Sequence, residues 1–138
     1  MRDLPRQLSV DELAELFSGR TAFVERLAQL DDPLEHADEV ARALTPEEKL
    51  EALETHPRIG ERSAEQHGDD PEVLAELAEL NRAYEKKFGF RFIVFVNRRS
   101  RSELVPVLRE RLERTRDEEM DTALGELVAI AKDRWSQR

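Results

Sequence analysis

The sequence predicts an all-α protein, a single-domain helical bundle of about seven or more helices spanning residues 1–138. Three observations support this class: Ala, Leu, Glu and Arg are abundant, apolar residues recur at helical spacing, and Ser/Thr-x-x-Glu start signals are frequent. A chain of 138 residues suits one domain and can bury a substantial core.

The helix starts are the clearest local signals. A capping box pairs a Ser or Thr side chain with a backbone amide three residues on, while the Glu at that position reaches back. It occurs at Ser9 with Glu12, Thr45 with Glu48, Ser100 with Glu103, and Thr115 with Glu118. Pro46 and Pro71 lie just inside two starts, where a missing amide hydrogen has no cost.

These starts, the apolar spacing and the end signals together predict the bounds of the helices. We expect them at residues 10–18, 21–30, 34–44, 46–55, 71–87, 101–113 and 117–135. Gly19 and Gly89 follow two of the ends, where a left-handed cap is common.

Apolar stripes on these helices predict the core. Their members are Leu13, Leu16, Phe17, Phe23, Val24, Leu27, Leu74, Leu77, Leu80, Tyr84, Leu104, Leu108, Leu112, Leu124, Leu127 and Ile130.

One segment departs from the helical pattern. Residues 88–96, FGFRFIVFV, are almost wholly apolar and rich in aromatic and β-branched types, which taken alone indicate a buried strand. No second strand is evident elsewhere in the sequence, and a lone strand cannot satisfy its backbone. We therefore expect a buried extended connector or a short helix, whose amides find other partners, a ligand among them.

Charge and composition narrow the function classes. The formal net charge of −9 argues against broad contact with nucleic acid or anionic membranes. The absence of cysteine excludes disulfides, thiol nucleophiles and thiolate metal sites. Neither an apolar signal core nor a membrane-length apolar run is present, so a cytoplasmic location is expected.

His56 is the first candidate for chemistry. The helix over 46–55 should stop before it, because Pro57 disfavours helical geometry in the preceding residue. A histidine at a helix C-terminus experiences a negative dipole end that favours the protonated ring, and it could donate a proton near neutral pH. The plainer alternative is a surface histidine that caps a helix.

Glu65 and Gln66 follow shortly after. A carboxylate beside an imidazole can raise its basicity and fix its tautomer, and a carboxamide can serve an amide-like ligand. Both could equally be solvated polar residues. His36 and His67 have the surroundings of exposed loop residues, and their spacing predicts no metal site.

Arg134 shares a helix face with Leu127, Ile130 and Ala131. An arginine on an apolar stripe must pair, extend to solvent or serve a ligand. Its planar fork of donors suits a carboxylate or an imide-like ring.

These segments together resemble the 2-oxo-4-hydroxy-4-carboxy-5-ureidoimidazoline (OHCU) decarboxylase family of urate breakdown. The resemblance rests on HPRIG at 56–60, EQ at 65–66, NRAYEKKFGFRFIVFV at 81–96 and TALGELVAIAKDRW at 122–135, in the family's order. It implies an all-helical homodimer that works without metal or organic cofactor on a small anionic ureide and yields (S)-allantoin.

The resemblance also implies residue roles. The catalytic candidates are His56, Glu65 and Arg134, with His56 as the acid. The substrate-binding candidates are Pro57, Arg62, Ser63, Glu65, Gln66, Phe92, Ile93, Val94, Phe95, Val96 and Arg134, of which 92–96 contribute backbone groups. The serine of the family falls on Arg62, with Ser63 one position late, and the nine positions from His56 to Glu65 are fewer than the family usually has.

Two other functions are compatible with these residues. One is a lyase or hydrolase that acts on another small cyclic ureide. The other is a helical binding or scaffold protein that keeps the fold without the activity.

Overall fold

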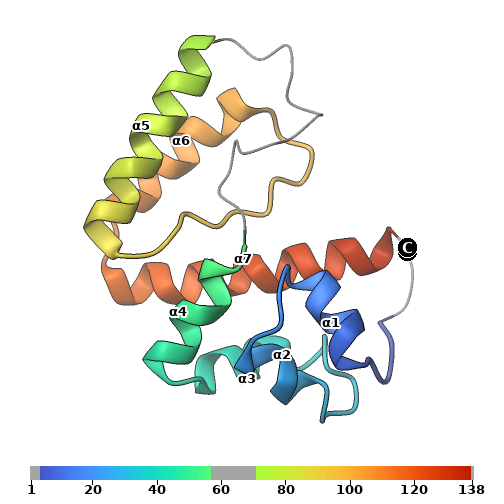
Figure 1. Ribbon diagram of the computed structural model, residues 1–138. Helices are drawn as coiled ribbons and strands as arrows, with labels where there is room; N and C mark the ends of the chain where they lie inside the picture. The colour runs from blue at the N-terminus through green and yellow to red at the C-terminus, as the bar shows by residue number, and fades with distance from the viewer. Residues whose placement is uncertain (1–3, 57–70, 138) are drawn as a thin grey trace.

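The computed structural model describes residues 4–56 and 71–137, and these residues contain seven α-helices (Figure 1). The helices are α1 Val10–Leu16, α2 Ala22–Leu27, α3 Ala37–Ala43, α4 Pro46–Glu54, α5 Pro71–Phe88, α6 Arg101–Leu112 and α7 Arg116–Ser136. The described residues contain no strand. The all-α prediction is therefore confirmed, and each expected helix is present, although α2 and α3 are shorter than expected.

All four capping boxes are formed. In α4, for example, the Thr45 hydroxyl accepts from the Glu48 amide at 3.2 Å, and the Glu48 carboxylate accepts from the Thr45 amide at 2.9 Å. The boxes at Ser9, Ser100 and Thr115 have the same reciprocal pattern. Each of these four helix starts is thus specified by residues three positions apart, which explains why they were predictable.

Helix α7 is the longest helix and the common support of the others. Helices α1, α3 and α4 pack against it, and α2 lies between α1, α3 and α4. Helices α5 and α6 form a separate pair above α7 in Figure 1, and α5 also touches α7. No helix among the described residues is long and apolar enough to cross a membrane.

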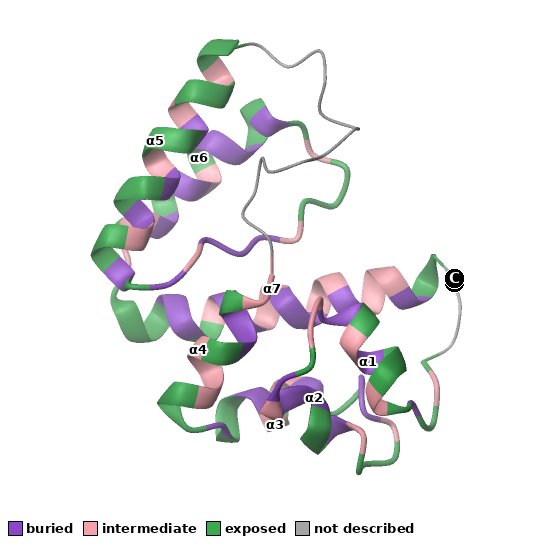
Figure 2. Cartoon of the chain, in the orientation of Figure 1, coloured by how far each residue is buried: buried purple, intermediate pink, exposed green. Residues whose placement is uncertain are grey.

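The core lies between these layers, and Figure 2 shows the buried residues on the inward faces of the helices. Most of the predicted stripe is buried, including Leu13, Phe23, Tyr84 and Leu108. Leu74 is a correction, because its side chain remains 36% exposed near the start of α5. Helical spacing identifies the apolar face of a helix. It does not show how far along the helix a neighbouring element covers that face.

The predicted helix ends differ in one respect. Gly89 adopts the expected left-handed conformation, with φ +82°. After α1, however, the left-handed residue is Ser18, at φ +64°, rather than Gly19. Gly19 serves a different purpose, since a Cβ added there would lie 2.8 Å from the Cβ of Thr55. Its lack of a side chain lets the end of α1 approach the end of α4.

Residues 89–100 form a connector between α5 and α6 with neither helical nor strand structure. Its apolar part is buried at Phe90 and at residues 92–94, which confirms one of the two expectations, whereas residues 96–98 are exposed. Its backbone is satisfied largely by side chains. Where the connector leaves α5, Arg116 donates to the carbonyl of the last helical residue, Phe88, at 2.9 Å; within the connector, Glu126 accepts from the Phe95 amide at 3.3 Å. Arg99 donates to the Phe95 carbonyl at 2.7 Å.

A buried cluster of Arg111, Glu119 and Tyr84 anchors the middle of this connector. Arg111 donates to the Glu119 carboxylate and to the Ile93 carbonyl, each at 2.7 Å. The Tyr84 hydroxyl donates to the same carboxylate at 2.5 Å, and burial raises the pKa of Tyr84, so the phenol keeps its proton. The guanidinium also lies 4.6 Å from the Phe92 ring centroid.

Candidate active site

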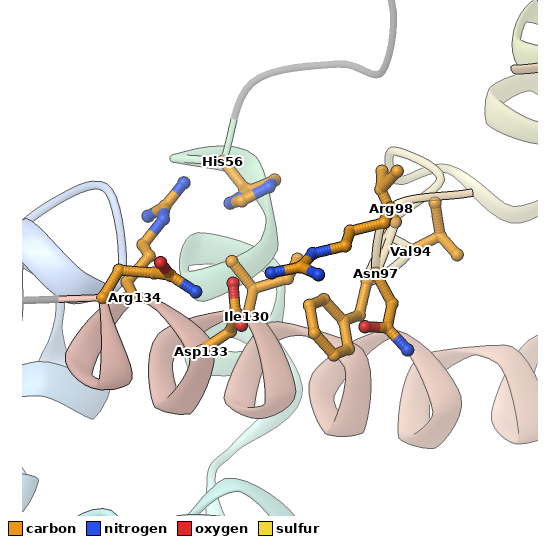
Figure 3. Close-up of a pocket in the computed structure, with 10 residues that line it drawn as sticks. His56, Val94, Asn97, Arg98, Ile130, Asp133 and Arg134 are labelled. Carbon is orange, nitrogen blue, oxygen red and sulfur yellow. The ribbon is translucent and has the colours of Figure 1, made fainter. Parts of the chain in front are cut away.

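A cavity of about 640 Å³ lies where the ends of α4 and α7 meet the connector (Figure 3). Its lining residues are His56, Val94, Phe95, Val96, Asn97, Arg98, Ile130, Asp133, Arg134 and Gln137. Three segments that are distant in sequence therefore contribute to one site. His56 and Arg134, which the sequence singled out separately, share this cavity.

His56 is placed by the C-terminal end of α4. Its amide donates to the Leu53 carbonyl at 3.3 Å, which closes the last turn. Arg91, from the connector, donates to the carbonyls of Glu54 and His56, both at 2.8 Å. One guanidinium therefore satisfies two carbonyls at the helix end and joins this wall of the cavity to the connector.

Arg134 reaches the cavity from the last turns of α7. Its Nη1 donates to the Leu16 carbonyl at 2.9 Å and to the Ser18 hydroxyl at 2.7 Å. The guanidinium is half-buried, and burial lowers its pKa from the ordinary value. Arg134 thus has protein partners in addition to facing the cavity, so its role is partly structural.

The connector contributes only part of the segment implied by the resemblance. Val94, Phe95 and Val96 line the cavity. Phe92 and Ile93 do not, because both are buried in the core and the Ile93 carbonyl is bound by Arg111.

The remaining candidates, Pro57, Arg62, Ser63, Glu65 and Gln66, lie outside the described residues. Their roles stay predictions. Among the described residues, no group of three or more His, Asp or Glu side chains is placed to hold a metal ion.

The cavity combines an imidazole, guanidinium groups and residues of the connector in one helical chain. The profile of the OHCU decarboxylase family matches residues 2–136 of this chain. The chain belongs to the OHCU decarboxylase family.

Relatives and solved structures agree with this family. The chain is 27% identical to 2-oxo-4-hydroxy-4-carboxy-5-ureidoimidazoline decarboxylase of Haloferax volcanii, over 94% of this chain and 88% of the relative. It is 31% identical to the uric acid degradation bifunctional protein TTL of Arabidopsis thaliana, covering 64% of this chain but only 32% of that longer protein. A crystal structure of OHCU decarboxylase in the presence of (S)-allantoin superposes with a TM-score of 0.78 at 27% identity, covering 91% of this chain and 96% of the other.

The chain is therefore an enzyme of a carboxy-lyase family, and the protonation state of its histidine matters. The pKa of His56 is lowered to about 4, first by burial and then by the positive charges of Arg134 and Arg91. The expectation that the helix dipole favours a protonated ring is wrong for the free protein. Desolvation and two nearby guanidiniums outweigh the partial charge of a helix end.

Nδ1 of His56 is buried without a hydrogen-bond partner among residues 4–56 and 71–137. A buried polar atom without a partner is costly unless a ligand or water completes it.

Sequence reasoning missed several lining residues, namely Asn97, Arg98, Asp133 and Gln137, and it missed Arg91 behind them. The signal for Arg98 was present, since it lies two positions after the apolar run of residues 88–96. Arg91 interrupts that apolar run, which indicates a charged residue with a specific partner.

Proposed function

We propose that this protein decarboxylates 2-oxo-4-hydroxy-4-carboxy-5-ureidoimidazoline and releases (S)-allantoin, without a metal or organic cofactor. Membership of the family supports the reaction. The observation that carries the proposal for this chain is the convergence of His56 and Arg134 on one cavity of about 640 Å³. Such a volume suits a small cyclic ureide together with several waters.

The reaction makes limited demands on the protein. The bond between the ring and its carboxylate breaks, CO2 leaves, and the electron pair left behind is delocalised by the conjugated ring of the substrate itself. The protein must orient the carboxylate, stabilise the charge that moves into the ring, and deliver one proton to one face. Arg134 attracts the anionic substrate, and Val94, Phe95 and Val96 of the connector line the same cavity.

His56 delivers the proton. In the free protein the ring is neutral, because the pKa of His56 is about 4. An anionic substrate beside Arg134 offsets the positive charge that depresses this pKa, so substrate binding itself favours uptake of the proton. After CO2 has left, the imidazolium protonates the ring, and the enzyme returns to its neutral state. Glu65 supports the imidazolium in this proposal.

The test generates the unstable substrate in place from urate and follows the optical activity of the allantoin that forms. The wild-type protein should accelerate formation of a single enantiomer, and a metal chelator should leave the rate unchanged. Without enzyme, the slow spontaneous decay is expected to give racemic product. A wild-type protein that leaves the decay slow and racemic would contradict the proposal.

The same assay separates the alternatives. A binding or scaffold protein with this fold would bind ureides without changing the rate or the handedness of the product. A lyase or hydrolase for another cyclic ureide would turn over a different member of a ureide panel. The short separation of His56 from Glu65 is the observation that keeps this second alternative open.

We also propose that the enzyme acts as a homodimer in the cytoplasm, with no nucleic-acid or membrane partner. The family resemblance supports the dimer. The net charge of −9 supports the absence of nucleic acid and anionic membrane, and the lack of cysteine is compatible with a reducing compartment. Light scattering of the purified protein should give twice the monomer mass of 16.0 kDa.

A further inference from the structure

The turn at Asn97 and Arg98 has an unusual backbone. Both residues lie in the left-handed region, with φ +49° and +65°, and neither is glycine. Asparagine tolerates this region, but a side chain such as that of arginine rarely adopts it and is strained there. Such strain persists only where the surroundings impose it, and it gathers at functional sites.

The surroundings do impose it. Next in the chain, the Arg99 side chain donates to the carbonyls of Phe95 at 2.7 Å and Val96 at 3.1 Å, and its amide donates to the Val96 carbonyl at 3.0 Å. Ser100 then caps α6. The turn is therefore held at both sides, which fixes the position from which the Arg98 side chain departs.

Arg98 lines the same cavity as His56 and Arg134. In Figure 3 its side chain extends from the connector across the cavity above Ile130 and below His56, while Arg134 lies on the other side of the histidine. No hydrogen bond or ion pair to the described residues engages the Arg98 guanidinium. Its donors are available to a bound molecule.

Arg134 and Arg98 differ in how many hydrogen-bond donors they have available for a ligand. Nη1 of Arg134 is already bound to the end of α1, and that guanidinium is half-buried. Arg98 is exposed and has all five of its donors available within the described structure. Among the described lining residues, Asp133 is the acidic one, so in this part of the lining two guanidiniums accompany one carboxylate near His56. The described part of the lining therefore carries a net positive charge although the chain as a whole is acidic.

We propose that Arg98 is a specificity-determining residue that binds the carboxylate of the substrate on the side of the cavity opposite Arg134. A planar guanidinium can hold a carboxylate through two parallel hydrogen bonds, which fixes its orientation as well as its charge. This inference rests on the proposed function for the identity of the substrate. The selection of anionic over neutral cyclic ureides follows from the cavity alone.

The test compares two stable probes, hydantoin-5-acetate, which carries a carboxylate, and neutral (S)-allantoin, by titration calorimetry. Arg98→Asn keeps a residue that tolerates the left-handed backbone and removes the charge. It should raise the Kd of hydantoin-5-acetate about tenfold, the scale of one charge-assisted hydrogen bond, and leave that of (S)-allantoin nearly unchanged. Arg98→Lys should recover only part of the affinity, because it lacks the planar fork.

The matched control is Arg82→Gln, which removes the same charge from an exposed position on α5 outside the cavity lining. It should leave both affinities unchanged. A second readout uses Arg98→Gly, which relieves the backbone strain and should raise Tm by roughly 2–5 °C while losing anion affinity. Equal losses in Arg98→Asn and Arg82→Gln, equal losses for both probes, or no binding of hydantoin-5-acetate by the wild type would overturn the inference.

Turnover of the wild type distinguishes this inference from the proposed function. Wild-type decarboxylation together with an unchanged KM in Arg98→Asn would overturn the role of Arg98 and leave the function standing. Absence of turnover, combined with anion binding that depends on Arg98, would overturn the function and support the selection of anions at this cavity.

Discussion

Two regions of this molecule are centred on arginines that make similar contacts but have different roles. In the buried cluster, Arg111 donates to the Ile93 carbonyl at 2.7 Å, and in the cavity Arg134 donates to the Leu16 carbonyl at 2.9 Å. The difference is the counter-charge. Glu119, whose side chain is 0% exposed, pairs with Arg111, whereas neither Arg134 nor Arg98 forms an ion pair with any residue of the described ranges.

The charge of Arg111 is paired with a carboxylate and stabilises the fold, whereas the unpaired charges of Arg134 and Arg98 can act on a molecule that enters the cavity. The Glu119 carboxylate is also bound by the Tyr84 hydroxyl, so the cluster joins α5, α6 and α7 through paired charges. Burial lowers the pKa of His56, the positive charge of Arg134 by contrast lowers it further, and that charge leaves the cavity receptive to an anion. The role of an arginine in an apolar setting is therefore inferred from its partners rather than from its burial.

The largest expected effect is on catalysis. His56→Asn should lower kcat by about 100- to 10,000-fold, because one placed proton donor contributes on this scale. The circular dichroism spectrum and the affinity for (S)-allantoin should remain, since the His56 backbone contacts to Leu53 and Arg91 do not depend on its ring. A kcat equal to that of the wild type would show that His56 is not the proton donor.

The next effect belongs to the buried cluster. Arg111→Met should lower the free energy of unfolding by about 3–5 kcal/mol, because it leaves Glu119 charged and buried without its main partner. The double variant Arg111→Met/Glu119→Leu should recover most of that loss, since it removes both charges. Urea denaturation of the two variants measures this. Equal instability of single and double variants would show that the pair itself is not the source.

Arg134→Ala tests the mixed role of the cavity arginine. It should raise KM and also lower the free energy of unfolding by roughly 1.5–3 kcal/mol, because it removes charge-assisted bonds to the Leu16 carbonyl and the Ser18 hydroxyl. Ser18→Ala is the matched control, since it removes one of those bonds and keeps the guanidinium. It should reduce stability slightly with KM unchanged, and a raised KM in Ser18→Ala would mean that the tether orients Arg134 for the ligand.

The smallest expected effect is a pH dependence of stability. The pKa of His56 is about 4 in the folded protein against an ordinary 6.5, so between these values the unfolded chain binds a proton that the folded chain does not. Stability should fall as pH decreases through this window. Between about pH 7.5 and about pH 5, His56→Asn should lose about 1–2 kcal/mol less than the wild type, allowing for partial solvation. Identical losses would contradict the lowered pKa.

The residues that were predictable share a short range of action. The box of Thr45 and Glu48, and the buried stripe containing Leu127 and Ala131, depend only on neighbours within a few positions. Ser18 is a counterexample at the same range, because it adopts the left-handed conformation that was expected of Gly19. Thr55 follows a helix that is distant in sequence from Gly19, so the close approach of these two residues cannot be predicted from the local sequence.

By itself, the sequence determined the seven helices, most of their starts, the family and the position of His56 at a helix end. Helical periodicity and capping operate within one or two turns, so these features follow from local letters. Only the tertiary structure decided that Arg111 pairs with a carboxylate and that Arg134 faces a cavity. It also decided that burial, together with Arg134 and Arg91, keeps His56 neutral. Those outcomes depend on burial and on charges brought together from separate helices, because the free energy of a charge is set by its surroundings.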